Sequence, residues 1–317
     1  MNILRIPLDE LPRCLPEEID LFICSASFEE RCRLVANHID PWRVRCALVA
    51  ENENHRELHG DNARYLMDRF GSSAVPVMLD TGKPLKTADS LSAALEKCAL
   101  SEPRNLCVDV TTFTHEGFLI LFSLLKRNFN PDIVKYLYSS AREYSIGDPV
   151  DKKWLSKGIG EVRSVLGYPG EMLPSRKLHL IVLVGFEHER VRELITRYEP
   201  SVISLGYGDS DEPGAETHHA ANKHGFEMVK ALFGEANEFT FSCYEPLETK
   251  SAIERQMRLS PECNVVVAAM NTKPSTIGAA LAALENEAIQ LCYAQALLYN
   301  YQHYSTPGSH CYIFDSI

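Results

Sequence analysis

Two glutamate–arginine pairs follow apolar, strand-like runs in the two halves of the sequence. Glu29 and Arg31 come shortly after the run that ends at Ser25, and Glu187 and Arg190 follow a similar run about 160 residues later. A guanidinium group fits phosphate oxygens with two parallel hydrogen bonds, and a carboxylate can act as a general acid or base. The pairs therefore have three interpretations: Arg31 and Arg190 as phosphate clamps, Glu29 and Glu187 as catalytic groups, or ion pairs that orient two domains.

A polar turn follows another apolar run in the second half. Residues 271–275 read Asn-Thr-Lys-Pro-Ser and lead into a helical stretch of small residues. Lys273 can offer a positive charge to a phosphate group, and Thr272 and Ser275 can offer hydroxyl groups. These three residues are candidate ligand contacts. The alternative makes Lys273 a solvated residue at the start of a helix.

The corresponding turn in the first half carries Thr114 and His115, which we take as degenerate counterparts of Thr272 and Lys273. Asp109 ends the run before this turn, and it can bind a ribose hydroxyl, accept an arginine or cap the next turn. The second half has alanine at the place of Asp109. His115 titrates near neutral pH and is a candidate for acid–base chemistry, with a structural role as the alternative.

Small residues follow the first apolar run of each half. Ser25 and Ser27 in the first half, and Gly185 in the second, stand between that run and a helical pattern. Serine at this place can cap a helix, or it can bind phosphate together with the free N–H groups of the helix. Glycine there permits a ligand to approach closely.

These residues recur because longer segments recur in the same order. Residues 20–31 return as 179–190, Pro-Leu-Lys-Thr at 84–87 returns as Pro-Leu-Glu-Thr at 246–249, and 105–115 returns as 264–273. A repeat of this length indicates a duplicated domain rather than a solenoid.

Short runs rich in Val, Ile, Leu and Cys alternate with longer helical patterns in both halves, one of them near residues 28–37. Continuous apolar strands between amphipathic helices indicate parallel sheets covered on both faces. We therefore predict an α/β fold of two tandem Rossmann-like domains, each with a mostly parallel five-stranded sheet, related by internal duplication as a pseudo-dimer. The expected domains are 1–147 and 176–317, joined by a linker at 148–175.

Composition sets limits on the ligand and the location. The chain has 317 residues and a formal net charge of −11, which argues against extended DNA binding. No Gly-x-Gly-x-x-Gly fingerprint or P-loop is present, and His218 and His224 lack the spacing of metal ligands on one helix face, so we expect no conventional cofactor and no metal. The ten cysteines form no C-x-x-C pair and predict reduced core thiols. Without a signal-like or membrane-length apolar segment, we expect a cytoplasmic protein that does not enter a membrane.

The segment 264–293 resembles the strand–turn–helix of CRISPR-associated Rossmann-fold (CARF) sensor domains. In that family a Thr-Gly-Gly-Thr-Lys-like turn lies beneath a cyclic oligoadenylate. The resemblance implies that Thr272 and Lys273 contact a ligand, and that two such halves share a groove suited to a symmetric nucleotide. Met270 and Asn271 replace the glycine pair of the family.

The leading hypothesis is a nucleotide-binding sensor or regulatory protein, of a kind found in prokaryotic antiviral defence. Its ligand would be a nucleotide or oligonucleotide in the groove between the halves, and its partner would be an effector protein. The first alternative is a nucleotide-processing enzyme, such as a ring-nuclease-like phosphodiesterase. Glu29 and Glu187 also resemble, in position, the glutamate with which TIR and deoxyribosyltransferase enzymes attack N-glycosidic bonds. The second alternative is a non-catalytic interaction subunit of a defence complex.

Overall fold

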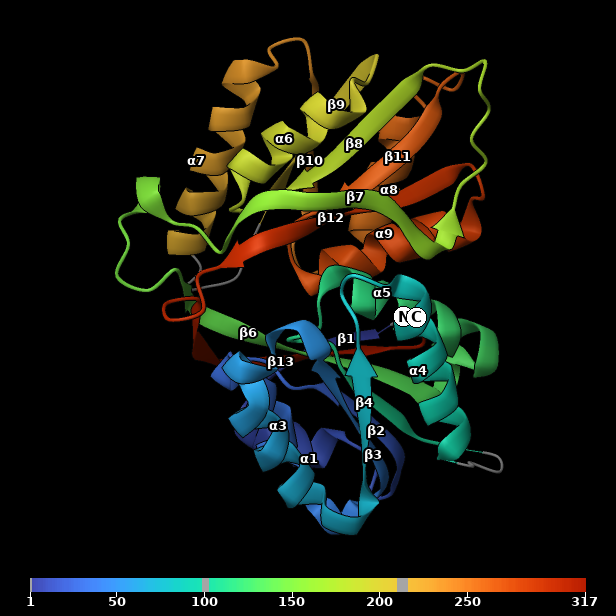
Figure 1. Ribbon diagram of the computed structural model, residues 1–317, viewed down its shortest axis with the longest axis vertical. Coiled ribbons are helices and arrows are strands. Elements are labelled where there is room, and N and C mark those ends of the chain that lie inside the picture. The colour runs from blue at the N-terminus through green and yellow to red at the C-terminus, as the bar shows by residue number, and fades with distance from the viewer. Residues whose placement is uncertain (1, 99–102, 210–215) are drawn as a thin grey trace. The chain divides into compact units, whose positions relative to one another are not determined.

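The computed structural model describes residues 2–98, 103–209 and 216–317 (Figure 1). The chain divides into two compact units, and it passes between them twice. Unit 1 comprises Met1–Glu143 together with Ser305–Ile317, and unit 2 comprises Tyr144–Tyr304.

Unit 1 is built on a seven-stranded sheet with the order β1-β13-β6-β5-β2-β3-β4 among its described residues. The strands are β1 (Asn2–Pro7), β2 (Ile19–Ser25), β3 (Val44–Asn52), β4 (Ala74–Leu79), β5 (Leu106–Asp109), β6 (Val134–Tyr144) and β13 (Ser305–Asp315). Its α-helices are α1 (Leu11–Cys14), α2 (Leu34–Asn37), α3 (Arg56–Phe70), α4 (Pro84–Lys97) and α5 (His115–Asn128). The buried side chains of α1, α2 and α3 form one core with alternate residues of β2 and β3, and α4 and α5 lie on the opposite face of the sheet (Figure 1).

Unit 2 has a six-stranded sheet with the order β10-β9-β8-β11-β12-β7 among its described residues. The strands are β7 (Ser156–Pro169), β8 (Leu178–Val184), β9 (Val202–Asp209), β10 (Asn237–Ser242), β11 (Asn264–Ala269) and β12 (Ile289–Tyr299). Its α-helices are α6 (His188–Tyr198), α7 (Glu216–Leu232), α8 (Pro246–Met257) and α9 (Lys273–Glu285). Side chains of α6 and α7 form a core with β8, β9 and β11.

Both units share one Rossmann-like strand order. The parallel strands of unit 1 are β2, β3, β4, β5 and β6 in chain order, and those of unit 2 are β8, β9, β10, β11 and β12. Numbered from first to fifth, both sets have the spatial order 3-2-1-4-5. The predicted α/β class with two Rossmann-like halves is therefore confirmed, and each five-stranded parallel set is extended by further strands.

The further strands shift the domain boundaries from those expected. The stretch 148–175, expected to be a linker, contains β7, which lies at the edge of the unit 2 sheet and pairs with β12 in antiparallel orientation. At the end of the chain, β13 lies between β6 and β1 in unit 1, although the sequence placed it in the second domain. Partner choice by a strand depends on pairing with residues far along the chain, which a local pattern does not report.

The exchange of these strands is reciprocal. β7 directly follows the fifth strand of the first repeat but completes the sheet of unit 2, whereas β13 follows the fifth strand of the second repeat but joins the sheet of unit 1. Each repeat therefore provides the sixth strand of the other unit.

The repeated Pro-Leu-x-Thr segments begin α4 and α8 and make the same contact in both units. Thr87 is buried, and its hydroxyl donates to the carbonyl of Asp80 at 3.0 Å, directly after β4. Thr249 is buried, and its hydroxyl donates to the carbonyl of Ser242 at 2.7 Å, at the end of β10. Both donors lie seven residues after their acceptors. The motif thus ties the start of a helix to the end of the third strand.

The cysteines differ from the fully reduced set expected from the sequence. Cys46 on β3 and Cys98 at the end of α4 form a disulfide, and the other eight cysteines are free. Proximity of these two residues depends on how α4 packs on the sheet, and a local sequence pattern does not report such packing. Within the described ranges, no helix has the length and apolar character needed to cross a membrane.

Replacing either repeated threonine by valine is expected to lower the free energy of unfolding by about 1–2 kcal/mol, because a buried carbonyl loses its donor while the side-chain volume is kept. Urea denaturation of Thr87→Val, Thr249→Val and the double variant measures this. Thr196→Val is the matched control, since Thr196 makes a similar bond to Arg192 on an exposed helix surface. A loss no larger than that of the control would contradict the proposed role of the motif.

Candidate functional site

In an open parallel sheet, ligands bind beyond the carboxyl ends of the strands where the strand order reverses. This switch point lies between the first and fourth strands: β2 and β5 in unit 1, and β8 and β11 in unit 2. The sequence-predicted residues gather at these two places. In unit 1 they are Ser25, Ser27, Glu29, Arg31, Asp109, Thr114 and His115, and in unit 2 they are Gly185, Glu187, Arg190, Thr272, Lys273 and Ser275.

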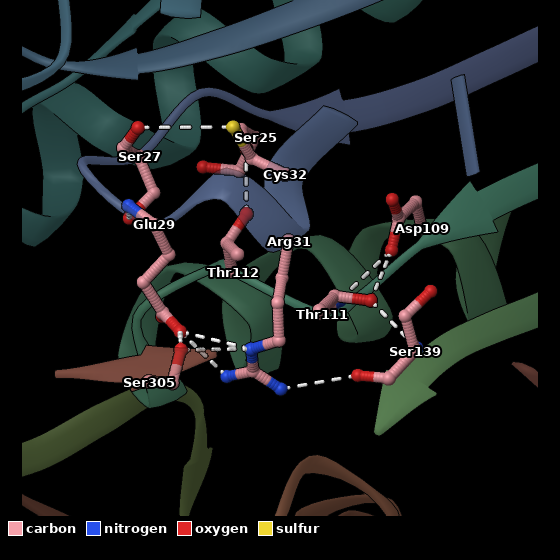
Figure 2. Close-up of polar contacts among 10 residues, drawn as sticks. All are labelled: Ser25, Ser27, Glu29, Arg31, Cys32, Asp109, Thr111, Thr112, Ser139 and Ser305. Carbon is pink, nitrogen blue, oxygen red and sulfur yellow. Dashed lines mark hydrogen bonds and ion pairs between the residues drawn. The ribbon is translucent and has the colours of Figure 1, made fainter. Parts of the chain in front are cut away.

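Glu29 and Arg31 form a buried ion pair within unit 1 (Figure 2). Arg31 donates from Nε and Nη2 to one carboxylate oxygen of Glu29, at 2.9 and 2.7 Å. Its Nη1 donates to the carbonyl of Ser139 on β6 at 3.0 Å, and Ser305 on β13 donates its hydroxyl to Glu29 at 2.5 Å. The pair therefore ties the loop after the first strand to the fifth and sixth strands.

Glu187 and Arg190 repeat this arrangement in unit 2. Arg190 donates to Glu187 at 2.5 Å and to the hydroxyl of Ser156 on β7 at 2.7 Å. It also donates to the carbonyl of Ala294 on β12, and Ser156 donates to Glu187. Ser156 and Ser305 are each the first residue of an exchanged strand. In both units the arginine after the first strand is thus held by a glutamate carboxylate, and the loop is fixed by the same two further partners: a serine hydroxyl of the exchanged strand and a backbone carbonyl of the fifth strand.

These contacts favour a structural role for both pairs. Each pair lies inside one unit, so it does not orient one domain against the other as the sequence suggested. The guanidinium groups are buried and donate to carboxylate, hydroxyl and carbonyl oxygens of the protein. All three guanidinium nitrogens of Arg31 donate to protein oxygens, whereas Arg190 keeps a buried Nε without a hydrogen-bond partner among the described residues. A glutamate that neutralises a buried arginine is poorly placed to act as a nucleophile.

Ser25 and Ser27 have different environments. The hydroxyl of Ser27 accepts the backbone N–H of Glu29 at 3.3 Å, so Ser27 caps the turn after β2. The turn continues as a 3-10 helix (Glu30–Arg33) and the short α2, whereas the sequence predicted a single helix near 28–37. Ser25 is 2% exposed, and its hydroxyl has no hydrogen-bond partner among the described residues. Because side chains alternate along a strand and Cys24 faces the core of α1–α3, the Ser25 side chain lies on the α4–α5 face.

Asp109 is a buried carboxyl at the end of β5 (Figure 2). It accepts the backbone N–H of Thr111 at 3.1 Å and the Thr111 hydroxyl at 2.5 Å, and that hydroxyl accepts the N–H of Ser139 at 2.9 Å. Burial raises the pKa of Asp109 from 3.8 to about 7, although the Thr111 hydrogen bonds and the charge of Arg31 oppose this shift. Of the three roles expected for Asp109, the structure shows the cap of the next turn.

Thr114 and Thr272 are helix N-caps. Thr114 accepts the N–H of Gly117 at 3.1 Å at the start of α5, and Thr272 accepts that of Ser275 at 3.3 Å at the start of α9. Lys273 is the half-buried first residue of α9, and His115 is the half-buried first residue of α5. Ser275 is fully buried and donates to the Thr272 carbonyl at 2.9 Å, so it supports the cap from inside.

The switch point of unit 2 is filled by its own backbone. A Cβ atom added to Gly185 would lie 2.3 Å from the carbonyl oxygen of Met270. Asn271 also donates to the carbonyl of Val184 at 2.7 Å, across the ends of β8 and β11. Gly185 is therefore required for the close approach of the neighbouring turn, and not for access of a ligand as expected from the sequence.

Sequence reasoning missed several residues of these networks. Thr112 donates to the carbonyl of Ser25 at 2.6 Å and corresponds in function to Asn271. Thr111 was predictable, because an Asp-x-Thr sequence at a strand end favours the turn that it forms with Asp109. Ser305 and Ser156 carried no usable signal, since each lies on a strand whose partner is distant in sequence.

Comparisons with known proteins do not assign a family. No protein-family model and no curated protein sequence matches the chain. Among solved structures, it is similar to a periplasmic ribose ABC transporter from Conexibacter woesei DSM 14684, with 12% identity, 86% of this chain and 70% of that chain covered, and a TM-score of 0.23. It is also similar to UDP-GlcNAc 2-epimerase from Neisseria meningitidis bound to UDP-GlcNAc, with 10% identity, 78% and 76% covered, and a TM-score of 0.25. Scores this low carry no argument, and the fold assignment rests on the strand order described above.

The raised pKa of Asp109 predicts a specific pH dependence of stability. The folded state keeps this proton up to about pH 7, whereas the unfolded state releases it near the ordinary value of 3.8, so stability falls as the pH rises between these values and stays reduced above them. Asp109→Asn removes this cost and keeps an acceptor for Thr111. The variant is expected to be more stable than the wild type at pH 8 by roughly 2–4 kcal/mol and to lose that advantage near pH 4.

Denaturant unfolding of both proteins from pH 4 to 8 tests this expectation. Asp61→Asn is the control, because the Asp61 side chain is 91% exposed. Parallel pH profiles for wild type and Asp109→Asn would show that Asp109 is already ionised in the folded protein.

Removing one charge from either buried pair is expected to destabilise the protein and not only to affect activity. Glu29→Gln and Glu187→Gln each leave a buried guanidinium without its counter-charge, at a cost of about 3 kcal/mol in the free energy of unfolding. Glu161→Gln is the control, since Glu161 pairs with Arg163 at 2.6 Å but is 58% exposed, and it should cost under about 1 kcal/mol. If Glu29→Gln abolished an activity at unchanged stability, Glu29 would instead be a catalytic group.

Proposed function

We propose that this chain is a nucleotide-binding sensor or regulatory protein, and that it holds a phosphate-containing ligand at the switch point of unit 1. The observation that carries the proposal is the pair of polar groups at the ends of β2 and β5. The Ser25 hydroxyl is buried without a hydrogen-bond partner among the described residues, and burial raises the pKa of the Asp109 carboxyl to about 7. A buried polar atom without a partner and a carboxyl with a strongly raised pKa are both typical of functional sites.

The two groups suit different parts of a nucleotide. Ser25 lies on the face of the sheet that α5 covers, so its hydroxyl and the N-terminal turn of α5 favour a phosphate there. Asp109 lies on the other face, beside Thr111, and an ionised carboxylate there favours a ribose hydroxyl. The arginines are engaged with the protein, so the phosphate is met by hydroxyl and backbone donors.

The resemblance to CARF domains supports a second location for the ligand, in unit 2. It implies that Thr272 and Lys273 in unit 2 contact a cyclic oligoadenylate, and that the protein reports to an effector in antiviral defence. The half-buried position of Lys273 is compatible with such a contact. The defence role and the effector partner rest on this resemblance alone.

One observation favours an enzyme as the second candidate. The pKa of Asp109, about 7, is the value that a general acid or base needs near neutral pH. Asp109 could then transfer a proton during hydrolysis of a phosphodiester or N-glycosidic bond of the same nucleotide. In this case Asp109→Asn would retain binding and lose turnover.

Thermal shift against mononucleotides, cyclic nucleotides and linear oligonucleotides tests the proposal, because a ligand that binds the folded state raises the melting temperature. A ligand at 100 times its dissociation constant is expected to stabilise the wild type by about 2.7 kcal/mol. Ser25→Ala should reduce the shift and Lys273→Ala should leave it, if unit 1 holds the ligand. The reverse pattern would support the CARF-like turn of unit 2.

Mass spectrometry of the same mixtures separates the sensor from the enzyme. A sensor leaves its ligand unchanged, whereas an enzyme produces cleaved nucleotide that Asp109→Asn does not. The absence of any shift and of any product across the panel would remove both nucleotide hypotheses and leave the interaction subunit.

A further inference from the structure

The Cys46–Cys98 disulfide joins β3 to the end of α4 on the α4–α5 face of unit 1. The two α carbons are 6.2 Å apart and the residues are 52 positions apart in the sequence. This distance lies within the ordinary range for disulfides, so the bond can form or break with little movement of the backbone. Cys46 is 7% exposed, and Cys98 is half-buried.

The other cysteines are poorly suited to redox chemistry. All eight are free, and all but the half-buried Cys14 are buried. Burial raises the pKa of Cys32, Cys107 and Cys292 to about 12, which leaves almost no thiolate at neutral pH. Since the thiolate is the reactive form, these residues behave as small apolar side chains. The Cys46–Cys98 pair is the one disulfide among the described residues, so it is the pair that a reductant can act on.

The same link exists in unit 2 without a covalent bond. In the strand registers Cys46 of β3 pairs with Leu21 of the first strand β2, and Ser204 of β9 pairs with Ile181 of the first strand β8. Ser204 donates to Gln256 near the end of α8 at 3.1 Å. Both units thus fasten the second strand to the end of the helix that follows the third strand, and only unit 1 does so with a bond that reduction can break.

We propose that Cys46 and Cys98 form a reversible thiol–disulfide switch that controls how firmly α4 is held on unit 1. The partner is a dithiol reductant, such as an oxidoreductase with a Cys-x-x-Cys site. One of its thiolates attacks Sγ of the more exposed Cys98, the S–S bond breaks, and Cys46 leaves as a thiolate that takes up a proton. The second thiol of the partner then attacks the mixed disulfide and releases Cys98, so two electrons and two protons pass from the dithiol to the cysteine pair.

The switch acts on a helix that reaches the carboxyl edge of the sheet. α4 begins there, where Thr87 bonds the carbonyl of Asp80, and ends at the disulfide, so the oxidised protein holds the helix at both ends. Reduction frees one end only. This control of how firmly α4 is held does not depend on the proposed ligand.

The experiment equilibrates the full chain in glutathione buffers of graded potential and quenches it by alkylation. Mass spectrometry of the Cys46 and Cys98 peptides gives the fraction oxidised, and thermal denaturation of the same samples gives the melting temperature. We expect the pair to titrate as a two-electron couple within the range that glutathione buffers, with a melting temperature roughly 5–10 °C lower when reduced. Hydrogen exchange should increase in α4 on reduction and stay unchanged in α8, which serves as an internal reference.

Two variants test whether the response to the buffer comes from this disulfide. Cys98→Ser should match the reduced wild type in melting temperature and should no longer respond to the buffer, whereas Cys14→Ser should respond as the wild type does. A pair that stays oxidised in fully reducing buffer is a permanent structural bond, and a pair that never oxidises in the folded chain is no disulfide. Either result overturns the proposal. So does hydrogen exchange in α4 of Cys98→Ser that changes with the buffer potential as much as it does in the wild type.

Discussion

The constraint on which this structure depends is that backbone carbonyls at the carboxyl ends of the parallel strands must find donors. The residues that carry these carbonyls are buried or half-buried, and a buried carbonyl left without a donor costs about 1–3 kcal/mol. In both units a side chain supplies the donor at the end of the first and third strands and, on the fifth strand, two residues past its last pair with the fourth strand. The donor and acceptor residues are Thr112 to Ser25, Thr87 to Asp80 and Arg31 to Ser139 in unit 1, and Asn271 to Val184, Thr249 to Ser242 and Arg190 to Ala294 in unit 2. The Pro-Leu-x-Thr segments and the glutamate–arginine pairs that recur in the sequence supply four of these six donors.

Once these shared contacts are set aside, the two units differ in a consistent way. Unit 1 has the Ser25 hydroxyl, the Asp109 carboxyl and a disulfide where unit 2 has Val184, an alanine and a Ser204–Gln256 hydrogen bond. Unit 2 also closes its switch point with the contact between Gly185 and the Met270 carbonyl. After a duplication, one copy can keep the fold while the other keeps groups that the fold does not require. These three differences favour unit 1 over unit 2 as the place of the proposed site.

The sequence predicted what local patterns determine. Apolar runs of strand length and the order of the repeat were enough for the five parallel strands of each unit and for the Rossmann-like class. It also placed the candidate residues at strand ends, but it left Arg31 and Arg190 open between an ion pair and a ligand contact. Their partners Ser139, Ser305 and Ala294 are more than 100 positions away and were not visible in the local pattern. The same limit applies to β7, whose pairing with β12 is a long-range contact, and to the disulfide, which depends on the packing of α4.

The exchange of sixth strands adds a constraint that neither repeat meets alone. The loop after β2 is fixed through Glu29 to Ser305, which the second repeat supplies, and the loop after β8 is fixed through Glu187 to Ser156, which the first repeat supplies. A repeat without the other would lack the strand beside its fifth strand and the hydroxyl that its buried glutamate accepts. Since hydrogen-bond donors stabilise a buried carboxylate, neither repeat is complete without the strand that the other supplies. This dependence gives a physical reason why both repeats keep the glutamate, the arginine and the serine.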